Sequence, residues 1–426
     1  MSDIQEKINH VVRGPVWRPG VAGFDEARLP WNRAVEQPVD AVVEAADPAD
    51  VAALVRYAGT NGLTVAPQPN GHGATGRTDG TILLRTRKLD ALDIDPVNRR
   101  ARIGAGVSSG RLQQAAAAYG LTGLPGSSPV VSVTGVALGG GLSWFGRTHG
   151  WVADSVRALD VVDAEGRERH VTADSDPDLF WALRGAGGDF AVVTALELDL
   201  HPAPHLYGGR MMWTGEHAFA VLSAYQQIVD NAPDELTLWF TLVHFPGADP
   251  MVTVDATYLG PEAEARDLLA ELDRLPQPIA DSRRVMAVDE LGGITGEPTE
   301  PSAGLSHAEL LTTLDDALLA EPIAPLLSVQ VRHLGGAFAR PSDSPHGPLT
   351  EPFALYLFGI PRDPEGVLAK QAALAASLPT SGRKPFTFLN PAETVADAFA
   401  PEVVERLRRI KSNVDPGGVF RSNFPV

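Results

Sequence analysis

Pro67-Gln68-Pro69-Asn70-Gly71-His72-Gly73-Ala74-Thr75-Gly76 is a loop rich in glycine and proline that directly follows a predicted strand over residues 63–66. Glycines let backbone N–H groups approach a bound anion closely, and a neutral imidazole can act as a nucleophile. The loop by itself is also compatible with an ordinary turn in which His72 has no chemical role. The rest of the chain has to decide between these two interpretations.

A second glycine-rich stretch spans residues 123–150 and includes Gly135, Gly146 and the run Gly139-Gly140-Gly141. Only residues without a bulky side chain let a backbone lie against a flat ring or a pyrophosphate. The stretch is too long to be a single turn. It therefore favours a second ligand-contacting segment over a set of structural turns.

Between these stretches, residues 106–110 match the G-x-S-x-G pattern of a hydrolase nucleophile elbow. The alternative is that Ser108 or Ser109 caps the helix predicted over residues 111–119. A hydrolase of this type needs a late histidine, yet the last one, His346, lies far from the C-terminus. A hydrolase is therefore a remote hypothesis, ranked third behind two hypotheses that follow from the rest of the chain. The sequence also has no G-x-G-x-x-G motif at the start of a helix, so a nicotinamide-binding site is unsupported.

Length and composition narrow the class of protein. The chain has 426 residues, a formal net charge of -18 and no cysteine. This length predicts two domains, and the acidic balance argues against nucleic acid as a partner. The absence of cysteine excludes disulfides and thiolate metal sites, and we expect no metal. Without an apolar run that could span a membrane or form a secretion signal, we expect no membrane partner and a cytoplasmic location.

The pattern of predicted helices and strands changes after residue 205. The part before it predicts a helix from Pro48 to Gly62, short strands, and a long strand over residues 191–200. The part from 206 to 385 predicts an antiparallel sheet backed by helices, a separate α+β domain. Its strands are expected at 236–245, 251–258, 326–332 and 353–359, and its helices at 262–272, 307–319 and 364–377.

Taken in order, five segments resemble one known family. They are the loop around His72, residues 102–107, residues 126–141, residues 179–194 and residues 415–423. Together they resemble the berberine-bridge-enzyme-like flavoproteins of the vanillyl-alcohol-oxidase / p-cresol-methylhydroxylase superfamily, in particular the bacterial branch that contains 6-hydroxy-D-nicotine oxidase. The resemblance covers roughly residues 40–200 and 385–426.

The resemblance implies an α+β fold with a two-subdomain FAD-binding domain of PCMH type and an α+β substrate-binding domain. The FAD-binding domain would comprise residues 1–205 and return with residues 386–426, and the substrate-binding domain would comprise residues 206–385. The resemblance also implies that FAD is bound covalently, through a bond from His72 to the flavin 8α-methyl carbon.

The further residues that the resemblance places at FAD come from both glycine-rich stretches, from the long strand and from the C-terminal return. They are Asn70, Gly71, Gly73, Ala74, Gly76, Pro125, Gly126, Ser128, Val133, Thr134, Gly135, Leu138, Gly139, Gly140, Gly141, Gly146, Val192, Val193, Asn390 and Asn423.

This sequence departs from the family at several positions. Many relatives carry a cysteine that bonds flavin C6, where this chain has Ser128, so the link is expected through histidine alone. Many have a tyrosine that acts on the substrate, where this chain has Phe388, two residues before Asn390. Ser132 and Ala191 stand where relatives usually have glycine.

The implied function is an FAD-dependent oxidase that takes hydride from a small organic substrate of specialised metabolism and passes the electrons to molecular oxygen. An alcohol, a hemiacetal or an amine would suit. The alternative is a redox-quiet flavoprotein that binds or sequesters a small molecule, because the expected tyrosine is absent.

Any proton acceptor must then come from elsewhere, and the substrate-binding sheet is the source that we favour; without one, hydride transfer would rest on positioning alone. Three candidates stand in the apolar runs of this sheet, namely Tyr356, His244 and His333. Tyr356 is our first choice, since a phenol near a cationic network would have a lowered pKa. Because neighbours alternate between faces, Arg332 and His333 cannot both face the flavin within a regular strand.

Overall fold

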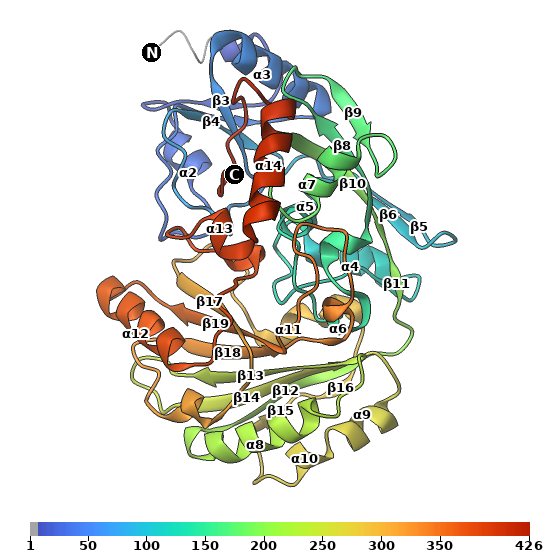
Figure 1. Ribbon diagram of the computed structural model, residues 1–426, viewed down its shortest axis with the longest axis vertical. Helices are drawn as coiled ribbons and strands as arrows, with labels where there is room; N and C mark the ends of the chain where they lie inside the picture. Colours follow the sequence, from blue (N-terminus) through green and yellow to red (C-terminus); the bar gives the residue numbers. More distant parts are fainter. Residues whose placement is uncertain (1–6) are drawn as a thin grey trace.

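The computed structural model describes residues 7–426, and its sheets form an upper and a lower part in Figure 1. Two smaller sheets lie in the upper part, and one eight-stranded sheet lies below them. The mixed helix and strand content and the antiparallel sheet confirm the predicted α+β class. No helix in the described part of the chain is both long and apolar enough to cross a membrane.

The first small sheet has the strand order β1-β2-β4-β3. Its strands are β1 (Val16–Trp17), β2 (Ala41–Glu44), β3 (Thr64–Pro67) and β4 (Thr81–Arg85). The last three are parallel, and the helices α2 (Phe24–Arg28) and α3 (Pro48–Asn61) accompany them. As predicted, Asp47 caps α3 by accepting from Asp50 N, and Gly62 ends it in the left-handed region.

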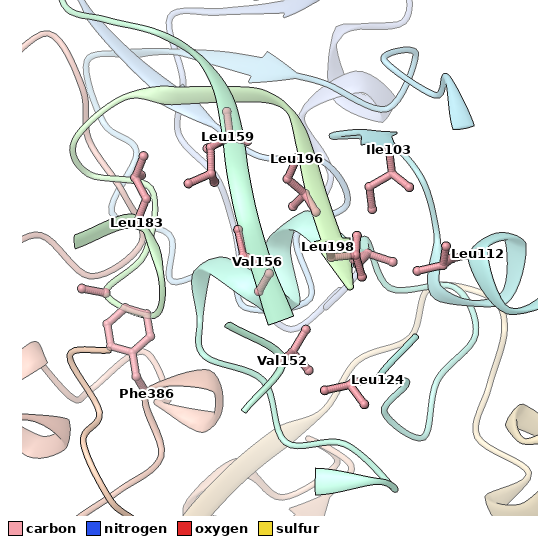
Figure 2. Close-up of a cluster of buried hydrophobic side chains, with 14 of the residues drawn as sticks. Ile103, Leu112, Leu124, Val152, Val156, Leu159, Leu183, Leu196, Leu198 and Phe386 are labelled. Carbon is pink, nitrogen blue, oxygen red and sulfur yellow. The ribbon is translucent and has the colours of Figure 1, made fainter. Parts of the chain in front are cut away.

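The second small sheet is antiparallel, with the order β5-β6-β10-β8-β9. Its strands are β5 (Leu92–Asp95), β6 (Arg100–Gly104), β8 (Val156–Val162), β9 (Glu168–Val171) and β10 (Val192–Asp199). Leu159 and Leu196 lie on adjacent strands of its core (Figure 2), which also takes in Phe386 from near the C-terminus. This shared core joins segments that are far apart in the sequence.

Several short elements complete the upper part. They are α4 (Ser109–Ala117), β7 (Leu121–Thr122), α5 (Val133–Leu138), α6 (Gly146–His149), α7 (Pro177–Leu183), β11 (His201–Pro202) and α13 (Val395–Ala398). The G-x-S-x-G segment proves to be a helix start, because Ser108 caps α4 by accepting a hydrogen bond from Arg111 N.

The C-terminal helix α14 (Pro401–Val414) returns to the upper part of the molecule (Figure 1, red). Its apolar side packs into the core of the second sheet through Val404, Leu407 and Ile410. Beyond it, the backbone of Val419 and Arg421 pairs with Val65 in β3. Both ends of the described chain therefore build the region around the His72 loop.

The large sheet is antiparallel, with the order β15-β12-β14-β13-β18-β19-β17, and β16 also pairs with β12. Its strands are β12 (Tyr207–Thr214), β13 (Leu236–Val243), β14 (Met251–Tyr258), β15 (Ala280–Asp281), β16 (Arg284–Val285), β17 (Leu305–Leu311), β18 (Ser328–His333) and β19 (Phe353–Gly359).

One face of the large sheet is apolar and covered by helices on the side away from the small sheets (Figure 1). These helices are α8 (Ala218–Val229), α9 (Glu262–Leu268), α10 (Ala270–Asp273) and α12 (Pro364–Ser377). The other face meets the upper part, where Trp239 stacks on Trp144 at 3.5 Å between ring centroids. The short helix α11 (Gly292–Thr295) lies between β12 and the upper part.

The predicted helix over residues 307–319 is wrong. Residues Leu305–Leu311 form the edge strand β17, and only Asp316–Leu319 is helical, as a short 3-10 turn. Seven cross-strand pairs with β19 hold β17 in place. Pairing between distant residues thus outweighs the local helix propensity of this segment.

Candidate FAD and substrate site

The His72 loop connects β3 to β4 and is fixed by contacts to three other segments. The Asn70 side chain donates to Val130 O at 2.8 Å, in the second glycine-rich stretch. The Thr75 hydroxyl donates to Asn423 O at 3.2 Å, in the C-terminal segment. The backbone of Trp31 donates to Asn70 O. The structure therefore brings the predicted cofactor segments together around one loop.

His72 is held in an apolar, aromatic setting. Its ring stacks on Trp31 with centroids 4.4 Å apart. Its Nε2 is buried and has no hydrogen-bond partner among residues 7–426. Burial lowers the pKa of His72 to about 4, so the imidazole is neutral at physiological pH and keeps a free lone pair.

The glycines of the two stretches fall into two groups. A side chain at Gly73 would meet no atom within 4 Å, and at Gly126 or Gly135 the nearest atoms would be 3.7 and 3.9 Å away. Gly73 therefore has open space beside its backbone, and a side chain at Gly126 or Gly135 would make only ordinary van der Waals contacts. Gly135 also follows Thr134, whose hydroxyl is buried without a partner in the described chain.

Gly139 to Gly141 and Gly146 pack against protein instead. A side chain at Gly140 would overlap the His346 ring, and one at Gly146 would overlap Phe338. At Gly141 a side chain would run into Val136 and Val152, and at Gly139 it would touch Thr387. The lack of a side chain at Gly140, Gly141 and Gly146 is thus explained by close packing of the polypeptide on itself.

His346 is the residue that fills the space beside Gly140. Its ring stacks on Trp151 with centroids 4.3 Å apart and would also meet a side chain at Gly185. Burial lowers the pKa of His346 to about 3. The His346 side chain is therefore neutral and fills the space between Gly140 and Gly185.

The other predicted cofactor residues lie in or beside these segments. Val192 and Val193 are in β10 with their side chains in hydrophobic cores. Leu138 ends α5, and its carbonyl accepts from Gly187 N. The Asn390 side chain accepts from Ala392 N at 2.9 Å, which closes a local turn. The remaining positions are Gly71 and Gly76, both with positive φ, the buried Ala74, and Pro125, Ser128 and Val133.

The residues present fit an FAD. An imidazole nitrogen and a hydroxyl that are buried without a partner among residues 7–426, and three glycines without close neighbours, lie in segments that contact one another. Gly73, Gly126 and Gly135 would let their backbone lie against the cofactor, and His72 would present its neutral ring. Val133 and Thr134 form the first turn of α5, which Ser132 caps through Gly135 N.

The face of the large sheet that meets the upper part carries Tyr356. Cross-strand register places Tyr356 opposite Gln330 on β18 and Ala308 on β17. Its ring packs against Phe388 at 5.1 Å. The Arg332 guanidinium lies 5.6 Å from the Tyr356 ring centroid and 4.0 Å from that of Trp239. Phenol, guanidinium and amide groups therefore share one face, walled by aromatic rings.

The sequence predicts a lowered pKa for Tyr356, and for the polypeptide chain by itself this prediction is wrong. Burial raises its pKa, although a hydrogen bond from Ser306 and the charge of Arg332 act in the opposite direction. Desolvation of the phenolate thus outweighs the nearby cation.

His333 and His244 lie apart from Tyr356. His333 is the next residue after Arg332, so it points to the helix-covered face, where its Nε2 is 2.9 Å from Arg147 Nη1. Burial lowers its pKa to about 3. His244 lies one residue beyond the end of β13 and is partly exposed. The structure does not bring either histidine to the Tyr356 face.

Sequence reasoning missed several residues of the site. Trp31 gave no signal, because its stacking on His72 depends on a contact between distant segments. Gln330 lies directly opposite Tyr356, and Arg332 is two residues further along the same strand. Strand alternation therefore puts both side chains on the face of Tyr356, and this could have been inferred from the sequence. Glu297, in the loop after α11, is close enough for its charge to raise the pKa of Tyr356, Arg332 and Asp255.

Comparisons with known proteins identify the class of this protein. Residues 39–172 match a family model described as an FAD binding domain. The chain is 32% identical to (R)-6-hydroxynicotine oxidase of Paenarthrobacter nicotinovorans over 97% of both sequences. The crystal structure of 6-hydroxy-D-nicotine oxidase from Arthrobacter nicotinovorans superposes with a TM-score of 0.84, at 28% identity over 96% of this chain and 97% of that one.

A berberine bridge enzyme variant has the same fold, with a TM-score of 0.83 at 19% identity over the whole of both chains. Fold and site thus define an FAD-linked oxidoreductase with an FAD-binding domain of PCMH type. The chain belongs to the family of FAD-linked oxidases that contains (R)-6-hydroxynicotine oxidase.

Proposed function

We propose that this protein is an oxidase that removes a hydride from a small alcohol, hemiacetal or amine of specialised metabolism and uses molecular oxygen as the final acceptor. FAD, when bound, supplies the two-electron acceptor. The family supports the oxidoreductase class, and the observation that carries the assignment of the site is the free, buried Nε2 of His72.

We propose that FAD is covalently attached through His72. The imidazole is neutral because burial lowers its pKa to about 4, and only the neutral ring is a nucleophile. Trp31 fixes the ring plane by stacking, and the Gly71-His72-Gly73 backbone turns sharply with a positive φ at Gly71. Ser128 offers no thiol, so a second link is not expected.

We propose Tyr356 as the group that receives the substrate proton. It is the only one of the three predicted candidates on the face that meets the upper part. Arg332 and the Ser306 hydroxyl would stabilise its phenolate. Trp239 and Phe388 would hold the apolar body of the substrate and exclude water, which orients the reacting C–H bond.

The test is a screen of the purified, flavin-containing protein against secondary amines, alcohols and sugars under anaerobic conditions. Bleaching of the flavin absorbance by one class, followed by oxygen uptake in air, is the expected result. A flavin that stays oxidised with every class, in a protein that still binds some of them, would support sequestration instead.

A further inference from the structure

Arg332 is a buried cation without an ion-pair partner. It lies on β18 and is 6% exposed. Its Nε donates to Gln330 Oε1 at 2.7 Å, and within residues 7–426 no carboxylate lies within ion-pair distance of its guanidinium. Burial lowers its pKa, which reflects the cost of keeping this charge out of water.

The nearest acids do not neutralise Arg332. Asp255 is bound through both carboxylate oxygens by Arg210, at 2.6 and 2.8 Å. Glu297 influences Arg332 by its charge but forms no ion pair with it. The guanidinium therefore keeps its terminal N–H groups available on the face it shares with Tyr356.

Two other buried arginines, Arg85 and Arg147, donate to several acceptors each. Arg85 donates to Gln68 and to the carbonyls of Ala27 and Leu29. Arg147 donates to the carbonyls of Leu236 and several neighbours. Arg332 differs because aromatic rings, rather than acceptors, surround it, and cation–π contacts compensate only part of the desolvation. A buried guanidinium whose Nη1 and Nη2 bond no acceptor among residues 7–426, and which is set among aromatic rings, can recognise a carboxylate in bidentate fashion.

We propose that Arg332 binds a carboxylate of the substrate, so that the enzyme acts on an organic acid whose apolar body packs against Trp239 and Phe388. This inference rests on the proposed function, because it names the substrate class of the same site. It predicts that the neutral amide or ester of a substrate acid is a much poorer ligand.

The test compares benzoate and phenylacetate with benzamide and phenylacetamide as ligands of the FAD-containing protein. Binding is followed by titration calorimetry and by tryptophan fluorescence, since Trp239 lies 4.0 Å from the guanidinium carbon. We expect at least one acid to bind about ten- to hundredfold more tightly than its amide, as a charged hydrogen-bond pair would give. Arg332→Met should abolish this preference while changing amide binding little, and Arg332→Lys should restore part of it.

Arg266→Met is the matched control, because Arg266 is an exposed arginine of the same domain that pairs with Glu262. It should keep the preference for acids. Arg332→Met should also keep its melting temperature and FAD content, since removing an unpaired buried charge relieves desolvation.

Three results would overturn the inference. They are equal binding of each acid and its amide by the wild type, an unchanged preference in Arg332→Met, and a loss of FAD or of folding in Arg332→Met that weakens all ligands alike. These differ from failure of the proposed function, which would show as a wild-type protein that lacks FAD or never reduces it.

Discussion

At the scale of single residues, the chemistry of the site is divided between the two parts of the molecule. His72 belongs to a loop of the upper part, and its Nε2 is buried without a hydrogen-bond partner among residues 7–426. Tyr356 and Arg332 belong to the large sheet, and we propose that they transfer the proton and bind the charged group of the substrate. The position two residues before Asn390, where the family resemblance implies a tyrosine, is filled by Phe388, whose ring packs against Tyr356. We propose that the phenol of Tyr356, on β19, takes the place of that tyrosine.

Tyr356→Phe should slow flavin reduction by about 100-fold or more, in the usual range for loss of a general base. Because burial raises the pKa of Tyr356, the wild-type rate should increase as the pH rises toward that pKa, and the variant should lose this increase. Stopped-flow reduction across pH measures both effects. Tyr258→Phe is the control, since Tyr258 bonds Glu264 on the far face. Wild-type rates in Tyr356→Phe would remove Tyr356 from the mechanism.

At the scale of elements, glycine positions show why the sequence was only partly informative. The glycine-rich stretch over residues 123–150 correctly indicated unusually close approaches of the backbone. It did not reveal what approaches, because Gly140 faces His346 and Gly146 faces Phe338, both more than 190 residues away in the sequence. Local patterns predicted α3 and its end at Gly62, whereas the edge strand β17 depends on pairing that no local pattern contains.

Gly140→Ala should lower the melting temperature far more than Gly120→Ala. Both glycines have positive φ, so both substitutions carry a backbone strain of about 1–2 kcal/mol. Only at Gly140 would the new methyl group overlap a buried ring, that of His346, whereas Gly120 has no atom within 4 Å. Adding His346→Ala to Gly140→Ala should recover part of the loss. Equal melting temperatures for the two single variants would contradict the close packing of Gly140 against His346.

A nearly buried ionic cluster ties the large sheet to the C-terminal segment. Lys384 Nζ lies 2.8 Å from Glu309 Oε1 and also pairs with Glu393, while His307 bonds Glu309. Glu393 in turn accepts from the backbone of Asn390. The cluster therefore positions the segment that carries Phe388 and Asn390.

Lys384→Met should reduce the free energy of unfolding by about 3–5 kcal/mol, because it leaves two buried carboxylates without their cation. Urea unfolding at neutral pH measures this. Lys370→Met is the control, since Lys370 pairs with the exposed Glu321 and should change stability by less than about 1 kcal/mol. An equally small change in both variants would contradict a structural role for the cluster.

The pH dependence of this cluster follows from its two shifted groups. Burial acts to raise the pKa of Glu309, but hydrogen bonds from His307 and Lys384 lower it overall. Its contribution is therefore present above the unfolded pKa and is lost as the pH falls through the lowered value. Burial acts to lower the pKa of Lys384, but its two carboxylates raise it, so its contribution is lost as the pH rises through that raised value.

At the scale of the whole molecule, the upper part is built from two segments that are far apart in the sequence. The chain leaves it for the large sheet and comes back with α14 and the residues that follow. The FAD-binding class was predictable because its motifs are contiguous and short. The association of the C-terminal segment with the His72 loop, through Asn423 and Val419, followed only from family resemblance. Periodicity predicts that α14 is amphipathic, but not which core receives it. The predicted boundaries at residues 205 and 385 remain predictions.

The most direct test of the central claim is the mass of the denatured protein together with the flavin content of its acid supernatant. The account predicts that the wild-type chain carries the added mass of one FAD, that the precipitate stays yellow, and that the modified peptide contains His72. His72→Ala should fold, bind FAD reversibly and release all of it on precipitation. A wild-type chain of unmodified mass, with all of its flavin in the supernatant, would contradict the covalent attachment on which the proposed site is built.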